Sequence, residues 1–217
     1  NMIDAAKITK RNVSKILKAF QAVLIPGGFG TRGIEGMIIA CKYARENKLP
    51  YFGICLGMQI AIIEFSRNIL NLKNANSTEF NKKTKYPVIG LVTEWKDASG
   101  KTEHRTENSN LGGTMRLGGQ KCLIKKSSHS YKLYKKLTIT ERHRHRYEVN
   151  PEYKKELVSK GMDIVGTSLD GNLAEMIEIK KHPWFIGCQF HPEFTSNPRD
   201  GHPIFNDFIA KAIKIKR

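Results

Sequence analysis

Two short apolar runs, each followed by a glycine-containing turn and a helical pattern, constrain the fold of this chain more than any other feature. The runs are residues 22–25 (AVLI) and 51–54 (YFGI), and their length and lack of charged residues are typical of strands buried on both faces. Helical patterns follow at about 34–47 and 58–68. The order strand, helix, strand, helix predicts a parallel sheet that is covered by helices on both faces.

The second half of the chain has a different pattern, with short strand-like segments separated by turn residues. These segments are 88–92, 120–124, 138–149, 162–168, 173–179 and 184–190. They predict an antiparallel extension of the sheet, and an amphipathic pattern at 206–214 predicts a closing helix. The expected fold class is therefore α/β, with a central, mostly parallel sheet flanked by helices and extended by antiparallel strands. A length of 217 residues suits one domain, which we expect to span residues 1–217.

The chain is strongly basic, with a formal net charge of +17 at pH 7. Such an excess of lysine and arginine is compatible with nucleic-acid binding. The basic residues are, however, spread along helices and loops without a compact pattern of arginine and aromatic residues. We therefore expect a lysine-rich surface and no nucleic-acid partner.

Membrane association and secretion are not expected. No apolar run approaches the roughly 18–20 residues that a membrane-spanning helix needs. The N-terminal residues show no positively charged segment followed by an apolar one. The four cysteines, Cys41, Cys55, Cys122 and Cys188, are scattered without a C-x-x-C pair, which argues against a disulfide framework and against a zinc site. These features predict a cytoplasmic protein in a reducing environment.

One of these cysteines lies where the second apolar run turns into a helix, in the segment 53–57 (GICLG). At the head of a helix, unpaired backbone N–H groups and the helix dipole favour a thiolate. The flanking Gly53 and Gly57 are expected to permit a sharp turn and to leave room for a substrate beside the sulfur. A buried structural role suits the other three cysteines, which lie in apolar helices or strands. We therefore predict that Cys55 is a nucleophile.

A candidate base and a candidate carboxylate lie much further along the chain, at His191 and Glu193. They follow the strand predicted at 184–190, and in extended backbone residues two apart project to the same side. Pro192 between them prevents a helix and stiffens the pair. Alone, this segment could be a turn histidine beside a solvent-facing acid. Together with Cys55, it predicts a triad of nucleophile, base and orienting carboxylate.

Backbone amides in two loops are candidates for stabilising an oxyanion. One is the N–H of Leu56, and the other is the N–H of Gly28 in the loop 26–30 (PGGFG). Both loops follow predicted parallel strands, and open α/β sheets bind ligands at the carboxyl ends of their strands. The glycine loop could also be a plain tight turn. It is not a phosphate-binding P-loop, because the Lys-Ser/Thr pair is missing.

A basic segment, 141–147 (ERHRHRY), alternates arginine with histidine and is expected to form a strand. One face would carry the arginines, and the other would carry His143, His145 and Tyr147. We expect no metal site, because the arginines repel cations and no carboxylate cluster is near in sequence. An arginine of this segment could bind a substrate carboxylate, or the segment could be a solvated basic edge strand.

The pattern Gly-x-Cys-x-Gly-x-Gln with a distant His-Pro-Glu resembles the class I, or triad, glutamine amidotransferases. Longer stretches are more specific, and over nearly the whole chain they resemble the CTP synthases within that class. These stretches are 26–33 (PGGFGTRG), 74–80 (NANSTEF), 111–118 (LGGTMRLG), 141–150 (ERHRHRYEVN) and 194–203 (FTSNPRDGHP). Other triad amidotransferases share the Cys and His-Pro-Glu motifs but not these stretches.

The resemblance implies hydrolysis of L-glutamine. Cys55 would attack the side-chain amide and form a glutamyl thioester, with His191 as base and then acid and Glu193 as its orienting partner. The implied glutamine-binding residues are Gly28, Leu56, Gly57, Met58, Gln59, Glu79 and Arg146. Among them, Glu79 would face the α-ammonium group and Arg146 would border the pocket.

The resemblance also implies partners outside this chain. No cofactor is expected for glutamine hydrolysis, whereas ATP and Mg²⁺ would bind a synthetase domain that is absent here and that makes CTP from UTP. The loop 111–118 resembles a lid over the active site that is associated with activation by GTP, and the full-length enzyme is expected to be a homo-tetramer. In the family a further strand and helix precede the position of Asn1, so we expect this sequence to lack them.

Three other functions remain open. An amidotransferase serving another acceptor and a γ-glutamyl hydrolase of the same fold would use the same triad. Release of ammonia from free glutamine would separate the hydrolase from the amidotransferases. A catalytically silent interaction module is the non-enzyme alternative, and the intact triad weighs against it.

Overall fold

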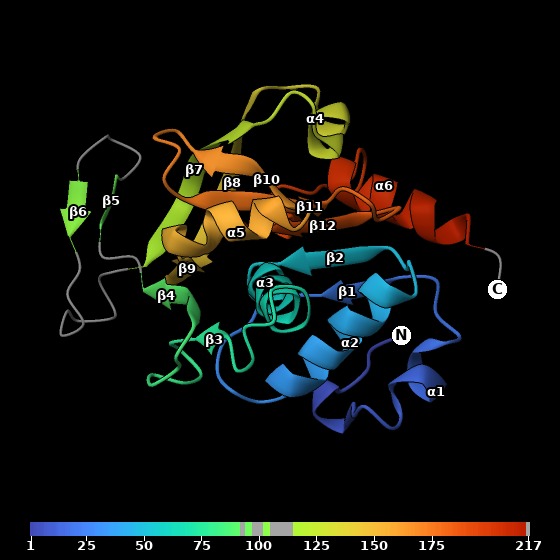
Figure 1. Cartoon of the computed structure of the whole chain (residues 1–217). Helices are drawn as coiled ribbons and strands as arrows, with labels where there is room; N and C mark the ends of the chain where they lie inside the picture. The colour runs from blue at the N-terminus through green and yellow to red at the C-terminus, as the bar shows by residue number, and fades with distance from the viewer. Residues whose placement is uncertain (92–93, 97–101, 105–114, 216–217) are drawn as a thin grey trace.

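The computed structural model describes residues 1–91, 94–96, 102–104 and 115–215. The largest sheet among these residues has seven strands in the order β1-β2-β12-β11-β10-β7-β8 (Figure 1). Their bounds are β1 Val23–Ile25, β2 Tyr51–Ile54, β7 Arg116–Ile124, β8 Thr138–His145, β10 Met162–Ser168, β11 Ala174–Ile179 and β12 Phe185–Cys188. Strands β1, β2 and β12 pair in parallel, and the pairs from β12 to β8 are antiparallel. The predicted α/β fold with an antiparallel extension is confirmed, and the extension begins at β11.

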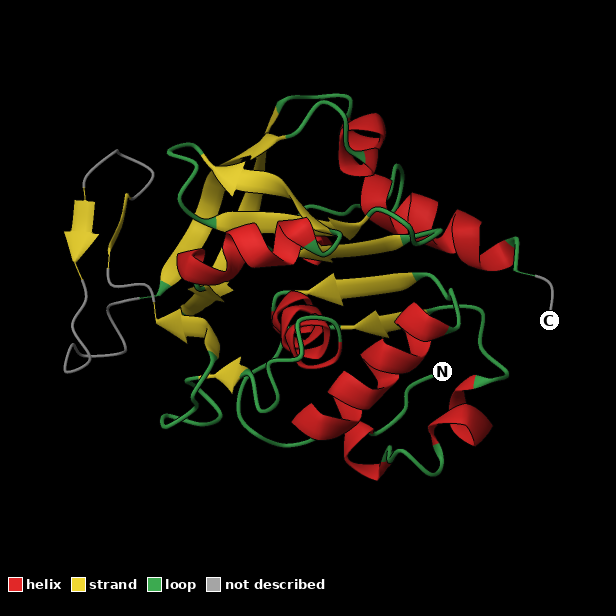
Figure 2. Ribbon diagram, in the orientation of Figure 1, coloured by secondary structure: helices red, strands yellow, loops and turns green. Residues whose placement is uncertain are grey.

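Helices cover both faces of this sheet (Figure 2). They are α1 Val13–Leu17, α2 Ile34–Glu46, α3 Leu56–Asn68, α4 His129–Tyr134, α5 Lys154–Ser159 and α6 Pro203–Ile213, with short 3-10 helices η1 Ala5–Lys7, η2 Pro151–Tyr153 and η3 Pro192–Phe194. One buried core lies between the sheet and α2, α3 and α5, and a second lies between the opposite face and α4 and α6. The sequence did not indicate α4 and α5, because six residues are too few to show a helical repeat. In the described part of the chain, no helix is long and apolar enough to cross a membrane.

Two smaller sheets lie beside the large one. Strands β3 Asn76–Ser77, β4 Pro87–Leu91 and β9 Tyr147–Val149 form one of them, and β5 Glu94–Lys96 pairs with β6 Thr102–His104 in the other. The strand predicted at 138–149 is therefore divided at Arg146. At this residue the chain leaves the large sheet as β8 and joins the smaller sheet as β9.

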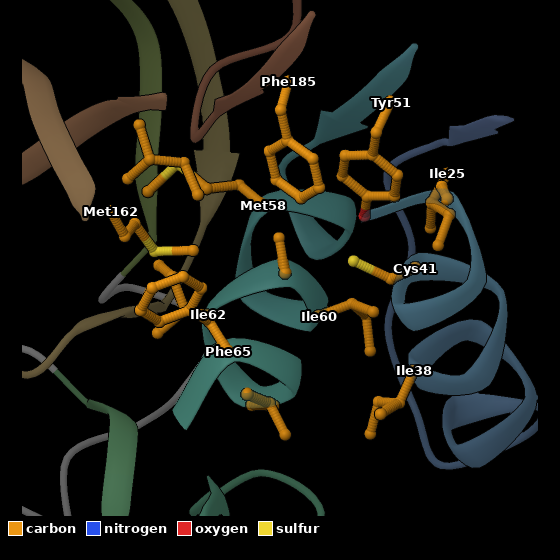
Figure 3. Packing of buried hydrophobic residues seen from close by; sticks show 14 of the residues in the cluster. Ile25, Ile38, Cys41, Tyr51, Met58, Ile60, Ile62, Phe65, Met162 and Phe185 are labelled. Atoms are coloured by element: carbon orange, nitrogen blue, oxygen red, sulfur yellow. The ribbon is translucent and has the colours of Figure 1, made fainter. Parts of the chain in front are cut away.

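Helix α3 is the central element of the larger core. Every residue from 56 to 66 is buried. Ile60 lies between Tyr51 of the sheet and Ile38 of α2, whereas the Met58 side chain extends to the strands, where a Cβ atom on Gly187 of β12 would lie 3.0 Å from its Cγ (Figure 3). The Tyr51 and Phe185 rings stack with their centroids 4.4 Å apart. Apart from Gln59, Glu64 and Ser66 the buried residues of α3 are apolar, and their burial fixes the position of the first turn of the helix.

Two glycines allow α3 to lie this close to the sheet. A Cβ atom on Gly57 would lie 2.2 Å from the backbone oxygen of Ile25 in β1, and one on Gly53 would lie 2.5 Å from the backbone of Gly57. Neither glycine has a positive φ, and the positive φ of the turn, 51°, belongs to Cys55. The roles predicted for these glycines, in the angles of the turn and in leaving room for substrate, are therefore wrong. They permit close approach of backbone to backbone.

We expect Gly57→Ala to destabilise the protein by more than about 3 kcal/mol, because the new methyl group would overlap the backbone of β1, which cannot move aside as a side chain can. The free energy of unfolding in urea measures the effect. Gly90→Ala is the matched control: its Cβ would meet no atom closer than 4.0 Å, so a change within about 1 kcal/mol is expected. Equal stability of the two variants would show that α3 does not depend on this contact.

Candidate active site

Cys55 lies between the end of β2 and the first residue of α3, at the carboxyl end of a parallel strand. Its φ of 51° is unusual for a residue that has a side chain. Hydrogen bonds hold this conformation on both sides. The Cys55 N–H donates to the carbonyl of Cys188 at 2.7 Å, and the Cys55 carbonyl accepts from the N–H of Gln59 at 3.2 Å. A strained strand-to-helix turn of this kind has the backbone geometry of a nucleophile elbow.

The side chain of Cys55 is buried, with 4% of the residue exposed. Burial raises the pKa of the Cys55 thiol to about 12; a hydrogen bond from the Leu56 N–H lowers it in part, and the charges of Glu148, Glu193 and Glu79 raise it further. The expectation of a thiolate at the head of the helix is therefore wrong for the resting protein, because desolvation outweighs the helix terminus. A neutral thiol needs a base to become a nucleophile.

His191 follows β12 and precedes η3. Its Nδ1 lies 2.7 Å from Oε1 of Glu193, as the two-residue spacing predicted. Burial alone would raise the pKa of Glu193, but the hydrogen bond with His191 and the local backbone outweigh it, so the pKa is lowered and the carboxylate stays ionised. An ionised Glu193 holds the ring hydrogen on Nδ1 and leaves Nε2 as an acceptor. This Nε2 is buried and has no hydrogen-bond partner among the described residues.

Cys55 and His191 line the same cavity, which has a volume of about 390 Å³. The predicted site residues that line it are Gly28, Cys55, Gln59, Glu79, Arg146 and His191. Further lining residues, which the sequence did not single out for this site, are Gly27, Phe29, Met115, Arg144, His145 and Tyr147. The volume lies within the range of about 300–1,000 Å³ that small-molecule sites have. Glu193 contacts His191 without lining the cavity.

The glycine loop packs directly against the base and the elbow. A Cβ atom on Gly27 would lie 2.6 Å from Cε1 of His191, so the loop can approach the imidazole only with glycine at this position. A Cβ atom on Gly28 would lie 3.2 Å from the Leu56 side chain. The two predicted oxyanion donors, the N–H groups of Gly28 and Leu56, therefore belong to neighbouring segments. This proximity is what a shared oxyanion site requires.

Two residues of opposite charge, Glu79 and Arg146, line the cavity. Oε1 of Glu79 accepts a hydrogen bond from the N–H of Gly30 at 3.0 Å. Burial raises the pKa of Glu79, although the Gly30 N–H and the charge of Arg146 lower it in part. Arg146 lies at the bend between β8 and β9 and lines the cavity. A carboxylate and a guanidinium on one cavity match the two charges of an amino-acid zwitterion.

A chain of amides connects the wall of the cavity to the sulfur. Nε2 of Gln59 donates to the carbonyl of Tyr147 at 3.1 Å and to Oε1 of Gln189 at 3.3 Å. Nε2 of Gln189 in turn donates to Sγ of Cys55 at 3.7 Å. The sequence analysis assigned no role to Gln189. The available signal was a polar residue within an apolar segment, two residues before His191, because an amide that is buried there needs hydrogen-bond partners.

Three residues predicted to bind glutamine do not present their side chains to the cavity. Met58 is fully buried in the larger core, and Gly57 contacts β1. The Leu56 side chain is also buried in this core. What these residues offer to a ligand is the backbone of the first turn of α3, whose N–H groups have no partner within the helix.

Exposed and buried side chains alternate along the basic segment 141–147, as predicted, up to the bend at Arg146. Arg142 and Arg144 are exposed, and His143 and His145 are buried. Arg146 departs from the alternation, because the chain changes sheets there. In the part of the chain that the structure describes, no group of three or more His, Cys, Asp or Glu residues is arranged so that it could hold a metal ion.

The loop predicted to act as a lid, 111–118, is described only in part. Residues 111–114 lie outside the described residues. Met115 lines the cavity, and the following residues form the start of β7.

The protein-family model of the class I glutamine amidotransferases matches residues 3–211. The chain belongs to this family. The glutaminase domain of Trypanosoma brucei CTPS with bound acivicin superposes with a TM-score of 0.86 and 36% sequence identity, covering 100% of this chain and 81% of that one. A candidate GMP synthase protein of Thermoplasma acidophilum gives a TM-score of 0.56 at 17% identity, covering 92% of this chain and 76% of that one. The second likeness shows the fold alone.

The high pKa of Cys55 predicts the pH dependence of its alkylation by iodoacetamide. Because only the thiolate reacts, the rate should rise about tenfold per pH unit from pH 7 to pH 10 without reaching a plateau, as the pKa is about 12. Mass spectrometry of the peptide that contains Cys55 measures this rate, and Cys55→Ser gives the background. A plateau near neutral pH would instead show that the resting sulfur is a thiolate paired with His191⁺.

Proposed function

We propose that this chain hydrolyses L-glutamine through a thioester at Cys55 and supplies the ammonia for amination of UTP to CTP by a separate synthetase domain. One observation carries the proposal: the sulfur of Cys55 and the imidazole of His191, whose Nε2 has no partner among the described residues, line one cavity of amino-acid size. Likeness to the CTPS glutaminase domain over the whole chain supports this substrate, since acivicin occupies that domain.

The first step needs a proton transfer, because the Cys55 thiol is neutral at rest. His191 accepts the thiol proton at Nε2 while Sγ attacks the carboxamide carbon of glutamine, and Glu193 stabilises the resulting imidazolium. The carbonyl oxygen becomes an oxyanion. The N–H groups of Leu56 and Gly28 are the donors that we assign to it.

Collapse of the tetrahedral intermediate breaks the C–N bond. His191 returns its proton to the leaving nitrogen, so ammonia departs and a glutamyl thioester remains on Cys55. Water then attacks the thioester carbonyl, with His191 as the base that takes its proton. Release of glutamate returns the proton to sulfur and restores the thiol.

Charge recognition positions the substrate for this chemistry. In our proposal the carboxylate of Glu79 binds the α-ammonium group, and Arg146 borders the α-carboxylate. Gln59 and the backbone of the first turn of α3 complete the wall. Binding both charges of the amino acid holds the carboxamide beside the sulfur.

The larger assembly is also a proposal, which rests on the resemblance to the CTP synthases. A synthetase domain would bind ATP, Mg²⁺ and UTP and use the ammonia, and the hydrolysis itself would need no cofactor. GTP would activate the glutaminase through the segment 111–118, and the full-length enzyme would be a homo-tetramer in the cytoplasm.

Removal of the nucleophile or the base should abolish ammonia release. We expect Cys55→Ala and His191→Ala to lower kcat for L-glutamine by at least about 1,000-fold while the fold is kept. Cys188→Ala is the matched control, because it removes a buried thiol beside the same strands and should affect packing only. Substantial turnover in either triad variant would contradict the assigned roles. Release of glutamate from poly-γ-glutamyl chains without ammonia from free glutamine would assign a γ-glutamyl hydrolase instead.

Loss of the charge at Glu79 should weaken binding more than chemistry. Glu79→Gln is expected to raise the KM for glutamine by about tenfold or more with a small change in kcat, because the α-ammonium group lies away from the reacting carbon. Steady-state ammonia release measures both constants. Glu152→Gln, an exposed residue of η2, controls for the loss of one negative charge. A fall in kcat at unchanged KM would place Glu79 in the chemical step.

A further inference from the structure

A buried carboxylate outside the cavity, that of Glu141, contacts the turn that carries the proposed base. Glu141 lies in β8, is 3% exposed and does not line the cavity. The reaction described above gives it no role. Two of the sequence stretches that resemble the CTP synthases, 141–150 and 194–203, meet at this side chain through Thr195 and His202. Its contacts therefore explain residues that the cavity alone does not.

Three hydrogen bonds surround the Glu141 carboxylate. Oε1 lies 2.8 Å from the hydroxyl of Tyr134 and 2.8 Å from Nε2 of His202. Oε2 lies 2.6 Å from Oγ1 of Thr195. These partners belong to three other segments, namely α4, the residue before α6 and the residue after η3. Glu141 is thus the point at which four segments of the chain are joined.

Each of the three partners donates to the carboxylate. Nδ1 of His202 accepts from a backbone N–H in the first turn of α6 at 3.3 Å, so the ring hydrogen is on Nε2, which faces Glu141. Burial and the charge of Glu141 raise the pKa of the Tyr134 hydroxyl, which therefore keeps its hydrogen. The Thr195 hydroxyl is 2.6 Å from Glu141 and 3.2 Å from the Pro192 carbonyl, and the shorter contact is with the carboxylate. A carboxylate only accepts, so three donors suit it.

The turn 191–195 is attached to β8 at two points. At its start, the N–H of His191 donates to the carbonyl of Arg142 at 2.8 Å. At its end, the hydroxyl of Thr195 donates to Glu141 at 2.6 Å. Two adjacent residues of one strand therefore hold both ends of the turn.

Between these two points the turn has no other attachment of this kind. In the described part of the chain, the hydrogen bonds of residues 192–194 stay within the segment 191–196. Glu193 belongs to the same turn, and its side chain is 42% exposed. It fixes the ring of His191 relative to the turn but not relative to Cys55. The hydrogen bonds that locate the turn relative to the sulfur are thus the two to β8.

Strand β8 is remote from the turn in the order of the sheet. Strands β11, β10 and β7 lie between β8 and β12, the strand that leads into the turn. Because β8 ends the seven-stranded sheet, its outer edge is available to the turn. The elbow at Cys55 is instead attached to β12, through the carbonyl of Cys188. Nucleophile and base are therefore held by different strands, and their relative position depends on the contact at β8.

We propose that Glu141 is a positioning residue for the catalytic base. Through the hydroxyl of Thr195 it holds the turn against β8, so that His191 keeps its place on the cavity that it shares with the sulfur. The role of His191 as the base rests on the proposed function, whereas the attachment of the turn does not. A misplacement of about 1 Å can slow a reaction on the order of 100-fold, so loss of this attachment acts on kcat.

Thr195 is the residue to change first, because it is exposed and its replacement does not disturb the core. Thr195→Val keeps the shape of the side chain and removes the hydroxyl. We expect it to lower kcat for L-glutamine by about tenfold and to leave KM within about twofold, because Glu79 and Arg146 keep their places on the cavity. Thr195→Ser keeps the hydroxyl and should hold kcat within about threefold of wild type. A fall in Thr195→Ser equal to that in Thr195→Val would overturn the proposal.

Thr84→Val is the matched control for this substitution. The hydroxyl of Thr84 donates to the carbonyl of Asn74 at 3.0 Å, and neither residue lines the cavity. The same change of side chain should leave kcat and KM unchanged at this position. Equal losses of kcat in Thr84→Val and Thr195→Val would contradict the proposal, because the loss would then not depend on the turn.

Glu141→Gln tests the carboxylate itself. The amide oxygen can stay with Tyr134 and His202, whereas the amide nitrogen then faces Thr195 and cannot accept from its hydroxyl. We expect kcat to fall as in Thr195→Val, and the double variant to fall no further, since both changes break the same hydrogen bond. Additive losses would count against the proposal, because Glu141 would then act by another route.

Proton NMR tests the position of the base without turnover. A Cβ atom on Gly27 would lie 2.6 Å from Cε1 of His191, so an α-hydrogen of Gly27 points at this carbon. We expect a nuclear Overhauser effect between the Gly27 α-hydrogen and the His191 Cε1 hydrogen, whose resonance is identified by its loss in His191→Ala. The effect should persist in Thr195→Ser and Thr84→Val and weaken in Thr195→Val, where the turn moves away from the glycine loop.

This measurement separates the two proposals. An unchanged Overhauser effect in Thr195→Val would overturn the positioning role, whether or not the protein releases ammonia. A wild-type protein without glutaminase activity in which Thr195→Val still weakens the effect would refute the proposed function and leave the attachment of the turn established.

Discussion

The contact between the backbone of Gly57 and the backbone of β1 is the constraint on which the site depends. It allows the first turn of α3 to lie against the parallel strands with no side chain between them. The turn before it must then reverse direction within one residue, and Cys55 takes the positive φ that this requires. The position of the sulfur is therefore a result of how tightly a helix packs on a sheet.

Tight packing also sets the chemical state of the sulfur. A side chain that is almost fully buried beside three carboxylates is a weak acid, and the N–H of Leu56 offsets only part of this effect. A neutral thiol is a poor target for oxidants, which react with thiolates. In the mechanism that we propose, the sulfur reacts when a bound substrate offers an electrophilic carbon and His191 accepts the thiol proton. His191 and Glu193 would then supply the ionisation that the helix terminus does not.

Local features were predictable from the sequence because they depend on neighbouring residues. The apolar runs of β1 and β2, the elbow at Cys55 and the pairing of His191 with Glu193 each involve a few adjacent positions. The salt bridge between Arg116 of β7 and Glu175 of β11 was not predictable, since the two residues lie far apart along the chain and their contact depends on the strand order. The hydrogen bonds of Gln189 with Gln59 and Cys55 were not predictable for the same reason. Gly53 and Gly57 were identified from the sequence, but their role was predicted wrongly. A close approach between backbone segments that are distant in sequence leaves no local pattern.

The division of one strand between two sheets at Arg146 has a mechanical consequence. Strand β8 is hydrogen-bonded to the large sheet and β9 to the smaller one, with a single residue between them. That residue and its neighbour Tyr147 form part of the cavity wall. The width of the cavity therefore depends on the angle between the two sheets. A tilt of the smaller sheet would move Arg146 and Tyr147 relative to the rest of the cavity wall.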